Sequence, residues 1–198
     1  MSCHLKPTYD NDIWASKTTQ AEEDCVEWVK NNIHLLPNQS KLLDIGIGTS
    51  HCYKELCTLF QEIHGITVME SEIVEALKLG YLGADYRVRI ANKHNSNQFV
   101  QQVDCDYSAI IDVNLKMFTC CEQHWLDYFH TLLMLLAPGG YIVSSTAGFG
   151  QYNSPVYGGI MGETLTIEEL TNLASLAGLV VELFPSPRIL NHSIVIIK

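Results

Sequence analysis

The sequence has few basic residues, no paired-cysteine motif and no long hydrophobic segment, and each absence narrows the possible functions. Among 198 residues, 12 lysines and arginines stand against 22 aspartates and glutamates, so the formal net charge is −10. Proteins that bind a phosphate backbone usually carry a basic surface, because counterion release supplies much of their affinity. We therefore expect neither nucleic acids nor membranes as partners.

The chain also offers little for secretion or membrane insertion. Its longest apolar run, Leu132 to Ala137, ends at Pro-Gly-Gly and is far shorter than the roughly 20 residues that span a bilayer. No opening segment combines basic residues with an apolar stretch, as a signal peptide does. Seven cysteines without a C-x-x-C pair are typical of reduced thiols. The expected location is cytoplasmic.

Composition and length favour one globular domain over residues 1–198. Hydrophobic residues make up 47% of the chain and charged residues 17%, which is typical of a folded protein rather than a disordered one. A chain of this length can bury a full core in one domain. It shows no internal repeat and leaves no room for a separate substrate domain.

The segment KLLDIGIGTS at residues 41–50 is the most informative part of the chain. An apolar run ends at Asp44, and Gly46 and Gly48 follow. Glycine permits a tight turn and lets a ligand approach the backbone closely. A strand that ends in such a turn and leads into a helix seats a nucleoside-bearing cofactor at the carboxyl edge of a parallel sheet. A dinucleotide fingerprint would need a third glycine at position 51, where the chain has His51.

This segment resembles motif I of the class I S-adenosylmethionine (SAM)-dependent methyltransferases, D/E-x-G-x-G-x-G, with Ser50 in place of the last glycine. The resemblance implies that SAM is the cofactor and S-adenosylhomocysteine its product. It also implies that Asp44, Gly46, Gly48 and Thr49 contribute to the cofactor site, with Asp44 near the methionine end. The alternative is a strand-to-helix turn that holds no ligand.

A second acidic residue follows the next apolar run. Residues 65–69 read GITVM and end at Glu70, 22 positions after Gly48. An acid about 20 residues beyond a glycine turn, at the tip of the next strand, is placed to accept hydrogen bonds from the ribose hydroxyls. The alternative role for Glu70 is to cap a helix that begins near Ser71.

Alternating apolar runs and helical patterns predict an α/β fold. The expected strands cover residues 41–45, 66–70, 85–91, 107–113, 179–184 and 193–198, with a further strand after Pro138-Gly139-Gly140. The expected helices cover residues 20–32, 51–64, 71–79, 121–136 and a stretch that ends at Gly178. The Pro-Gly-Gly turn and the terminal strand pair resemble the same family. We therefore expect a doubly wound, seven-stranded, mostly parallel sheet with an antiparallel last strand.

Two helix starts carry a capping box, in which a Ser or Thr precedes a Glu by three positions. Thr19-x-x-Glu22 opens the first helix, and Thr166-x-x-Glu169 opens a late one. Both patterns predict a threonine side chain that accepts a hydrogen bond from the backbone of the glutamate.

The resemblance also suggests residues for the acceptor and the adenine. Asp112 and Asn114 stand at the tip of strand four, where the family commonly places groups that touch the acceptor. Asp112 is thus a candidate for both catalysis and cofactor binding, with a helix cap or a buried carboxylate as alternatives. Asn114 is not followed by Pro-Pro-Tyr, so the signature of amide or adenine N-methylation is absent. Asn92 is expected near the adenine, with His94 as a less favoured neighbour.

His124 is the second catalytic candidate. An imidazole titrates near neutral pH and can act as a base, although a surface or capping histidine is the alternative. Cys120 and Cys121 precede it, but adjacent side chains on a helix diverge by roughly 100° and do not converge on one ion. We expect no catalytic metal, so methyl transfer should survive EDTA.

Two segments are expected to cover the active site. The first is the N-terminal arm and helix at residues 1–36, which would cover the cofactor edge. The second is residues 147–163, with five glycines and several aromatic residues. Such a composition suits a flexible lid, and it equally suits a long surface loop.

The leading hypothesis is an enzyme, a SAM-dependent methyltransferase that acts on oxygen or nitrogen of a small polar metabolite or biosynthetic intermediate. A catalytically degenerate subunit of the same fold is the first alternative, because Ser50 replaces a glycine and no base is unmistakable. A nicotinamide-dependent oxidoreductase is the second, against which His51 stands. The sequence leaves the acceptor and the oligomeric state open, a homodimer included.

Overall fold

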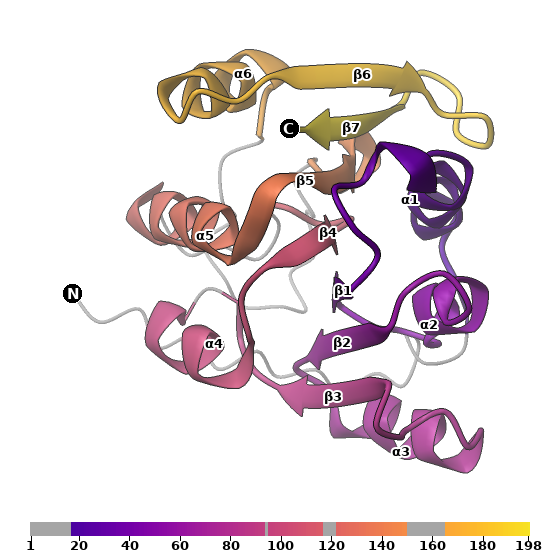
Figure 1. The fold of residues 1–198 in the computed structure, drawn as a ribbon. Helices are drawn as coiled ribbons and strands as arrows, with labels where there is room; N and C mark the ends of the chain where they lie inside the picture. The colour runs from indigo at the N-terminus through magenta and orange to yellow at the C-terminus, as the bar shows by residue number, and fades with distance from the viewer. Residues whose placement is uncertain (1–16, 94, 117–121, 150–164) are drawn as a thin grey trace, which may run out of the picture.

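The computed structural model describes residues 17–93, 95–116, 122–149 and 165–198, and a seven-stranded sheet runs through its centre (Figure 1). The strands are β1 (Lys41–Ile45), β2 (Glu62–Thr67), β3 (Tyr86–Ile90), β4 (Tyr107–Ile111), β5 (Leu136–Ser145), β6 (Val181–Pro185) and β7 (Ser193–Ile197). Their order in the sheet is β3-β2-β1-β4-β5-β7-β6. β1 to β5 pair in parallel, and β7 lies antiparallel between β5 and β6. The predicted sheet with an antiparallel last strand is confirmed.

Helices cover both faces of the sheet (Figure 1). One layer holds α1 (Gln20–Asn31), α2 (His51–Leu56) and α3 (Glu70–Lys78). The other holds α4 (Ser96–Gln102), α5 (Glu122–Leu135) and α6 (Ile167–Leu176). Two 3₁₀ turns, η2 (Ile33–Leu35) and η3 (Thr146–Gly148), complete the described elements. In the described part of the chain, no helix is both long and apolar enough to cross a bilayer.

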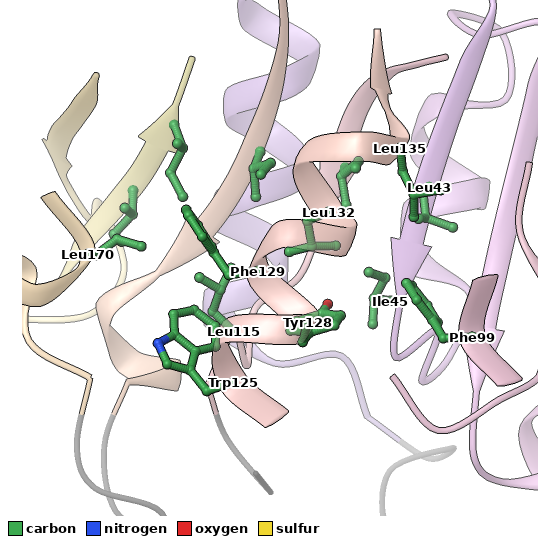
Figure 2. Close-up of a cluster of buried hydrophobic side chains, with 14 of the residues drawn as sticks. Leu43, Ile45, Phe99, Leu115, Trp125, Tyr128, Phe129, Leu132, Leu135 and Leu170 are labelled. Carbon is green, nitrogen blue, oxygen red and sulfur yellow. The ribbon is translucent and has the colours of Figure 1, made fainter. Parts of the chain in front are cut away.

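Each face of the sheet carries its own hydrophobic core. Figure 2 shows the core under α4, α5 and α6, where Leu43 and Ile45 of β1 gather with Phe99 and Tyr128. Leu42 belongs to the other core, with residues of α1, α2 and α3. Successive side chains of a strand point to opposite faces. Asp44, two positions after Leu42, therefore faces the layer of α1, α2 and α3.

Both predicted capping boxes are present. The Oγ1 atom of Thr19 accepts a hydrogen bond from the backbone N–H of Glu22 at 3.2 Å. The Oγ1 atom of Thr166 likewise accepts from the backbone N–H of Glu169 at 3.0 Å. The cap of α1 fixes the start of a helix whose first turn reaches the pocket described below.

The predicted boundary between the second helix and the second strand is wrong. α2 ends at Leu56 instead of near His64, and β2 spans Glu62–Thr67 instead of residues 66–70. The register explains the shift, because Glu62 pairs with Lys41 at the start of β1. His64 thus lies in a buried strand, where its Nδ1 is 2.7 Å from the hydroxyl of Tyr107.

One helix was not predicted. α4 begins after Asn95, whose side chain accepts a hydrogen bond from the backbone N–H of Gln98 at 3.3 Å. The segment is short and polar apart from Phe99 and Val100, so its helical period is weak in the sequence. Phe99 is fully buried in the core under α5 and anchors the helix there.

Several predicted features lie outside the described residues. They are most of the N-terminal arm (residues 1–16), His94, Cys120, Cys121 and most of the predicted lid (residues 150–163). The expectations for these segments stay predictions.

We predict that Gly148→Ala destabilises the protein by about 2 kcal/mol or more, because overpacking a rigid contact forces the backbone to shift. A Cβ atom at Gly148 would lie 1.7 Å from the carbonyl oxygen of Val113. Gly83→Ala is the matched control, since its Cβ would meet only the Asp85 carboxylate, at 3.2 Å. Urea unfolding of both variants measures the difference, and equal midpoints would contradict the predicted clash.

Candidate functional site

A pocket lies at the carboxyl ends of the first four strands. Its wall comes from the ends of β1, β2, β3 and β4 and from the segment that leads into α1. β1 has β2 on one side and β4 on the other, so the strand order reverses at this point, where open α/β sheets bind ligands. The lining residues are Lys17, Thr19, Glu22, Asp44, Ile45, Gly46, Gly48, Ile66, Thr67, Val68, Met69, Glu72, Ala91, Asn92, Lys93, Asp112, Val113 and Asn114.

The glycine turn after β1 forms part of this wall as predicted. Gly46 and Gly48 have φ angles of +87° and +47°, and both line the pocket. Ser50, at the last glycine position of the motif, also has a positive φ, of 58°. This left-handed conformation costs an ordinary residue roughly 1–2 kcal/mol. The buried Ser50 hydroxyl accepts a hydrogen bond from the Tyr86 hydroxyl at 3.2 Å, which helps to hold the serine there.

Two predicted cofactor residues lie outside the pocket wall. The hydroxyl of Thr49 is 2.7 Å from that of Thr18, a contact that ties the turn to the segment before α1. Glu70 was predicted at the tip of the second strand, which is wrong, because β2 ends at Thr67. Glu70 is instead the exposed first residue of α3 and is not among the residues that line the pocket.

Glu72 brings a carboxylate to the pocket on the side of α3. It is buried and lines the wall, and its Oε2 accepts a hydrogen bond from Thr67 Oγ1 at 2.6 Å. A backbone hydrogen bond from Gly48 reaches the same carboxylate. Burial raises the pKa of Glu72, and these two hydrogen bonds oppose the rise. Glu72 was not predicted as a site residue, although its spacing of four from Ala76 places it on the inner face of the helix.

Glu22 and Asp44 bring two further carboxyl groups to the pocket. They are 8% and 2% exposed, and Glu22 Oε1 and Asp44 Oδ2 have no hydrogen-bond partner within the described chain. Burial, together with nearby Asp44, raises the pKa of Glu22 to about 9. Burial, with Glu72 and Asp112 nearby, raises that of Asp44 to about 7, although a hydrogen bond with the Cys52 thiol opposes the rise.

Glu22 was interpreted from the sequence only as the second residue of a capping box. Its backbone N–H does serve the cap, and its side chain lines the pocket. The first helix was not expected to supply a named site residue. The helical period could have indicated that Glu22 faces inward, because Glu22 shares the buried face of α1 with Cys25 and Val29.

Asp112, at the end of β4, accepts several hydrogen bonds. Lys93 Nζ donates to Asp112 Oδ2 at 2.7 Å, and the Tyr128 hydroxyl donates to the same oxygen at 2.5 Å. The backbone N–H of Asn114 donates to Oδ1 at 3.0 Å. Lys93 Nζ also donates to the carbonyl oxygens of Asn114, at 2.8 Å, and Leu115, at 3.3 Å. Burial lowers the pKa of Lys93, and the charge of Asp112 opposes that fall. This network fixes the chain after β4.

The remaining predicted residues divide between the pocket and the outside. Asn92 follows β3 and lines the pocket, as its predicted role near the cofactor requires. His124 lies half-buried on α5 and is not among the lining residues. The structure thus brings Asp44, Gly46 and Gly48 together with Asn92 and Asp112, and it leaves His124 apart from them.

A second charged cluster lies at the start of β2, at the opposite end of the strands. Among the described residues, Glu62, His64 and Asp104 form the one group of three or more His, Cys, Asp or Glu residues whose potential ligand atoms all lie within 4.8 Å of one another. Arg87 already pairs with Glu62, and Lys41 Nζ lies 3.3 Å from Asp104 Oδ2. These positive charges compete with any metal cation. The cluster is therefore better described as an ion-pair network.

The sequence matches no protein-family model, and no curated protein matches it either. Solved structures do resemble the fold. The CcbJ methyltransferase from Streptomyces caelestis has a TM-score of 0.66 at 16% identity over 94% of both chains. The amino pentose methyltransferase CalS10 from Micromonospora echinaspora, solved with SAM bound, has a TM-score of 0.64 at 13% identity over 92% of both chains.

A third similar structure comes from a complex between the Haloferax volcanii Trm112 methyltransferase activator and a putative methyltransferase. It has a TM-score of 0.67 at 11% identity over 94% of both chains. Similarity to solved structures at such low sequence identity shows the fold alone. The chain has the α/β fold of the class I SAM-dependent methyltransferases.

We predict that Lys93→Met destabilises the protein by about 3–5 kcal/mol, because it leaves the buried Asp112 carboxylate without its charged partner. Lys93→Met combined with Asp112→Asn should be less destabilised than the single variant. Lys78→Met is the control, since its ion pair with Glu75 is exposed and such pairs contribute about 1 kcal/mol or less. Urea unfolding measures all three, and equal losses for Lys93→Met and Lys78→Met would contradict a structural role for the buried pair.

Proposed function

We propose that the protein is a SAM-dependent methyltransferase that transfers the methyl group to oxygen or nitrogen of a small polar metabolite or biosynthetic intermediate. One observation carries the proposal. The acid-glycine segment at residues 44–48 lines a pocket at the point where the strand order reverses, in a fold shared with methyltransferases. CalS10 has this fold and was solved with SAM bound.

The lining residues suit the parts of SAM. Gly46 and Gly48 give a surface without side chains, against which the cofactor can lie. Glu72 has carboxylate lone pairs for the ribose hydroxyls, and we assign this role to it in place of Glu70. Asn92 offers an amide near the expected adenine site. Lys17 and Thr19 also line the pocket, which supports the proposal that the segment before α1 covers the cofactor edge.

The chemistry asks little of the protein beyond alignment. SAM supplies a methyl group that is already activated on a sulfonium, so catalysis depends mainly on orienting the acceptor and removing its proton. Asp112 is the catalytic candidate that lines the pocket. Its carboxylate already accepts from Lys93, Tyr128 and the backbone of Asn114. We infer that Asp112 positions the chain beside the acceptor and that another group takes the proton.

A small acceptor agrees with the charge of the molecule. The chain carries a net charge of −10, and four carboxyl groups in the pocket wall are buried. A polyanion such as RNA would be repelled by such a surface. CalS10, an amino pentose methyltransferase, shows that this fold can serve a small acceptor.

A catalytically degenerate subunit is the second candidate. The occupied oxygens of Asp112 and the position of His124 away from the pocket wall favour it. Such a subunit would bind SAM, or no cofactor at all, and would methylate no acceptor. The alternative of a nicotinamide-dependent oxidoreductase gains no support, because His51 begins α2 at the position where a dinucleotide-binding turn has its third glycine. Calorimetric titration with SAM, S-adenosylhomocysteine and NAD separates the cofactors.

We predict that Gly46→Ala weakens SAM binding at least tenfold. The new Cβ meets no protein atom within 4 Å, so it occupies the space from which a ligand would approach the turn. Gly178→Ala is a matched control, since Gly178 also has a positive φ, +75°, and an equally open surrounding. Both substitutions place an alanine at a positive φ and introduce the same kind of backbone strain, but Gly178 is not among the lining residues. Calorimetry gives the affinities, and equal SAM affinity in the two variants would disprove the assignment of the turn.

We predict that Glu72→Ala weakens SAM roughly ten- to a hundredfold, because a hydrogen bond to a charged group typically contributes ~1.5–3 kcal/mol. Glu70→Ala on the same helix should change the affinity less than twofold. Adenine alone, which lacks the ribose, should bind both variants equally. A larger loss in Glu70→Ala than in Glu72→Ala would restore the original assignment of the ribose to Glu70.

A further inference from the structure

The sheet ends at one side in β6, whose outer edge has no neighbour among the described strands (Figure 1). In an antiparallel pair, the backbone groups of successive residues point alternately toward the neighbouring strand and away from it. Val180 exchanges hydrogen bonds of 2.8 and 3.1 Å with Lys198, so the even-numbered residues of β6 face β7. The N–H and C=O groups of Val181 and Leu183, and the carbonyl of Pro185, therefore point away from the sheet. Such an edge is a template for pairing with another chain.

The side chains of this edge suit a protein partner. Leu183 is 45% exposed and Phe184 is 38% exposed. Successive side chains of a strand point to opposite faces, so each face of the sheet has an exposed apolar side chain at this edge. Glu182 is the one charged residue of β6, and its Oε1 lies 2.7 Å from Nζ of Lys198. The edge thus combines open backbone groups with apolar side chains and a paired charge.

The opposite edge of the sheet, β3, differs in its charge. Its sequence YRVRI places Arg87 and Arg89 on the edge strand, and both are unlike the apolar residues of β6. Pairing β3 with a second β3 about Arg87, Val88 or Arg89 would set arginine opposite arginine, which is destabilising. Charged side chains on an edge strand protect it from such pairing. Of the two edges, β6 is therefore the one that fits a copy of itself.

A two-fold axis at Leu183 makes β6 complementary to itself. Leu183 then lies opposite the same residue of the second copy, and the two exchange both backbone hydrogen bonds. Each Val181 N–H reaches the Pro185 carbonyl of the other copy. Glu182 lies opposite Phe184, so no like charges face each other. An axis at Glu182 would set two glutamates opposite each other, and an axis at Phe184 would lose bonds because Pro185 has no N–H.

We propose that β6 is an interface between two copies of this chain, which pair antiparallel about Leu183 and join their sheets into one. A two-fold interface uses the same surface on both copies, as this register does. Backbone hydrogen bonds hold the two strands, and the apolar side chains on both faces add buried area. None of the residues that line the pocket belongs to β6, so the pairing leaves the pocket unoccupied and does not depend on the proposed function.

Sedimentation velocity from about 1 μM to about 1 mM protein measures the pairing over the matching range of dissociation constants. The unmodified protein should reach the mass of a dimer at the upper end. Leu183→Lys sets two lysines opposite each other and should weaken dimerisation at least roughly tenfold. Ile90→Lys is the matched control, because Ile90 is 44% exposed on the β3 edge and should leave the dimer unchanged.

A charge swap tests the register. Leu183→Glu should also be monomeric alone, and an equimolar mixture with Leu183→Lys should restore the dimer, because the axis sets position 183 opposite itself. Circular dichroism verifies that both variants are folded, and their SAM affinity should equal that of the unmodified protein. Two variants that each dimerise as well as the unmodified protein, or a mixture that stays monomeric, would overturn the proposal.

Amide hydrogen exchange of the unmodified protein needs no variant. The amides of Val181 and Leu183 should exchange more slowly as the protein concentration rises, because only the dimer gives them a partner. The amides of Glu182 and Phe184 face β7 and serve as the internal comparison. Concentration-independent exchange at Val181 and Leu183, or a monomer at every concentration, would overturn the interface and leave the proposed function standing.

Discussion

The parallel pairing of β1 with both β2 and β4 is the constraint on which the rest of the structure depends. Chain connections leave β1 and β4 in opposite directions along the sheet, so the helices that follow them cover opposite faces (Figure 1). Neither helix layer can fill the space between the two strand ends. The pocket at this edge is thus a consequence of topology, and the residues after each strand decide its chemistry.

The pocket has two walls with different electrostatics. On one side Asp112 is neutralised by Lys93 and by further hydrogen bonds, so the charge there is satisfied within the protein. On the other side Glu22 and Asp44 each have an oxygen without a hydrogen-bond partner among the described residues. A satisfied buried pair supports the scaffold, whereas unsatisfied carboxyl groups with raised pKa values mark a candidate binding surface. The asymmetry separates the part that holds the chain from the part proposed to hold a ligand.

The features that could be predicted from the sequence were those fixed by local chemistry. The turn after β1 needs glycine, the two capping boxes need their threonines, and the buried strand β4 reads as an apolar run apart from Ser108. The start of β2 could not be predicted in this way. His64 is polar, and the residues before it have the spacing of a helix. Only the pairing with β1 and the contact with Tyr107 place it in a strand.

The residues of the pocket show the same division between features set by local sequence and features set by tertiary packing. Asp44, Gly46, Gly48 and Asn92 were found because the motif or the end of a strand placed them. The predicted second strand ends three residues too late, which places Glu70 at its tip, whereas Glu72, two residues further along, is the acid on the inner face of α3. Glu22 was not predicted to line the pocket, because its place in a capping box already accounted for it. Both acids reach the pocket because their helices pack against the edge of the sheet. A rule based on spacing along the chain does not include such packing.

Two acids of the pocket wall, Asp44 and Glu22, also make the stability of the fold depend on pH. Ordinary carboxyl groups have pKa values of 3.8 and 4.5 for Asp and Glu, and the folded protein raises them to about 7 for Asp44 and about 9 for Glu22. Between these limits the folded state binds more protons than the unfolded state, so these groups contribute less stability as pH rises. Their contribution is complete below about pH 4 and is lost as pH rises through 7 and then 9. The carboxyl groups that line the pocket are therefore also groups that make the folded protein less stable at high pH.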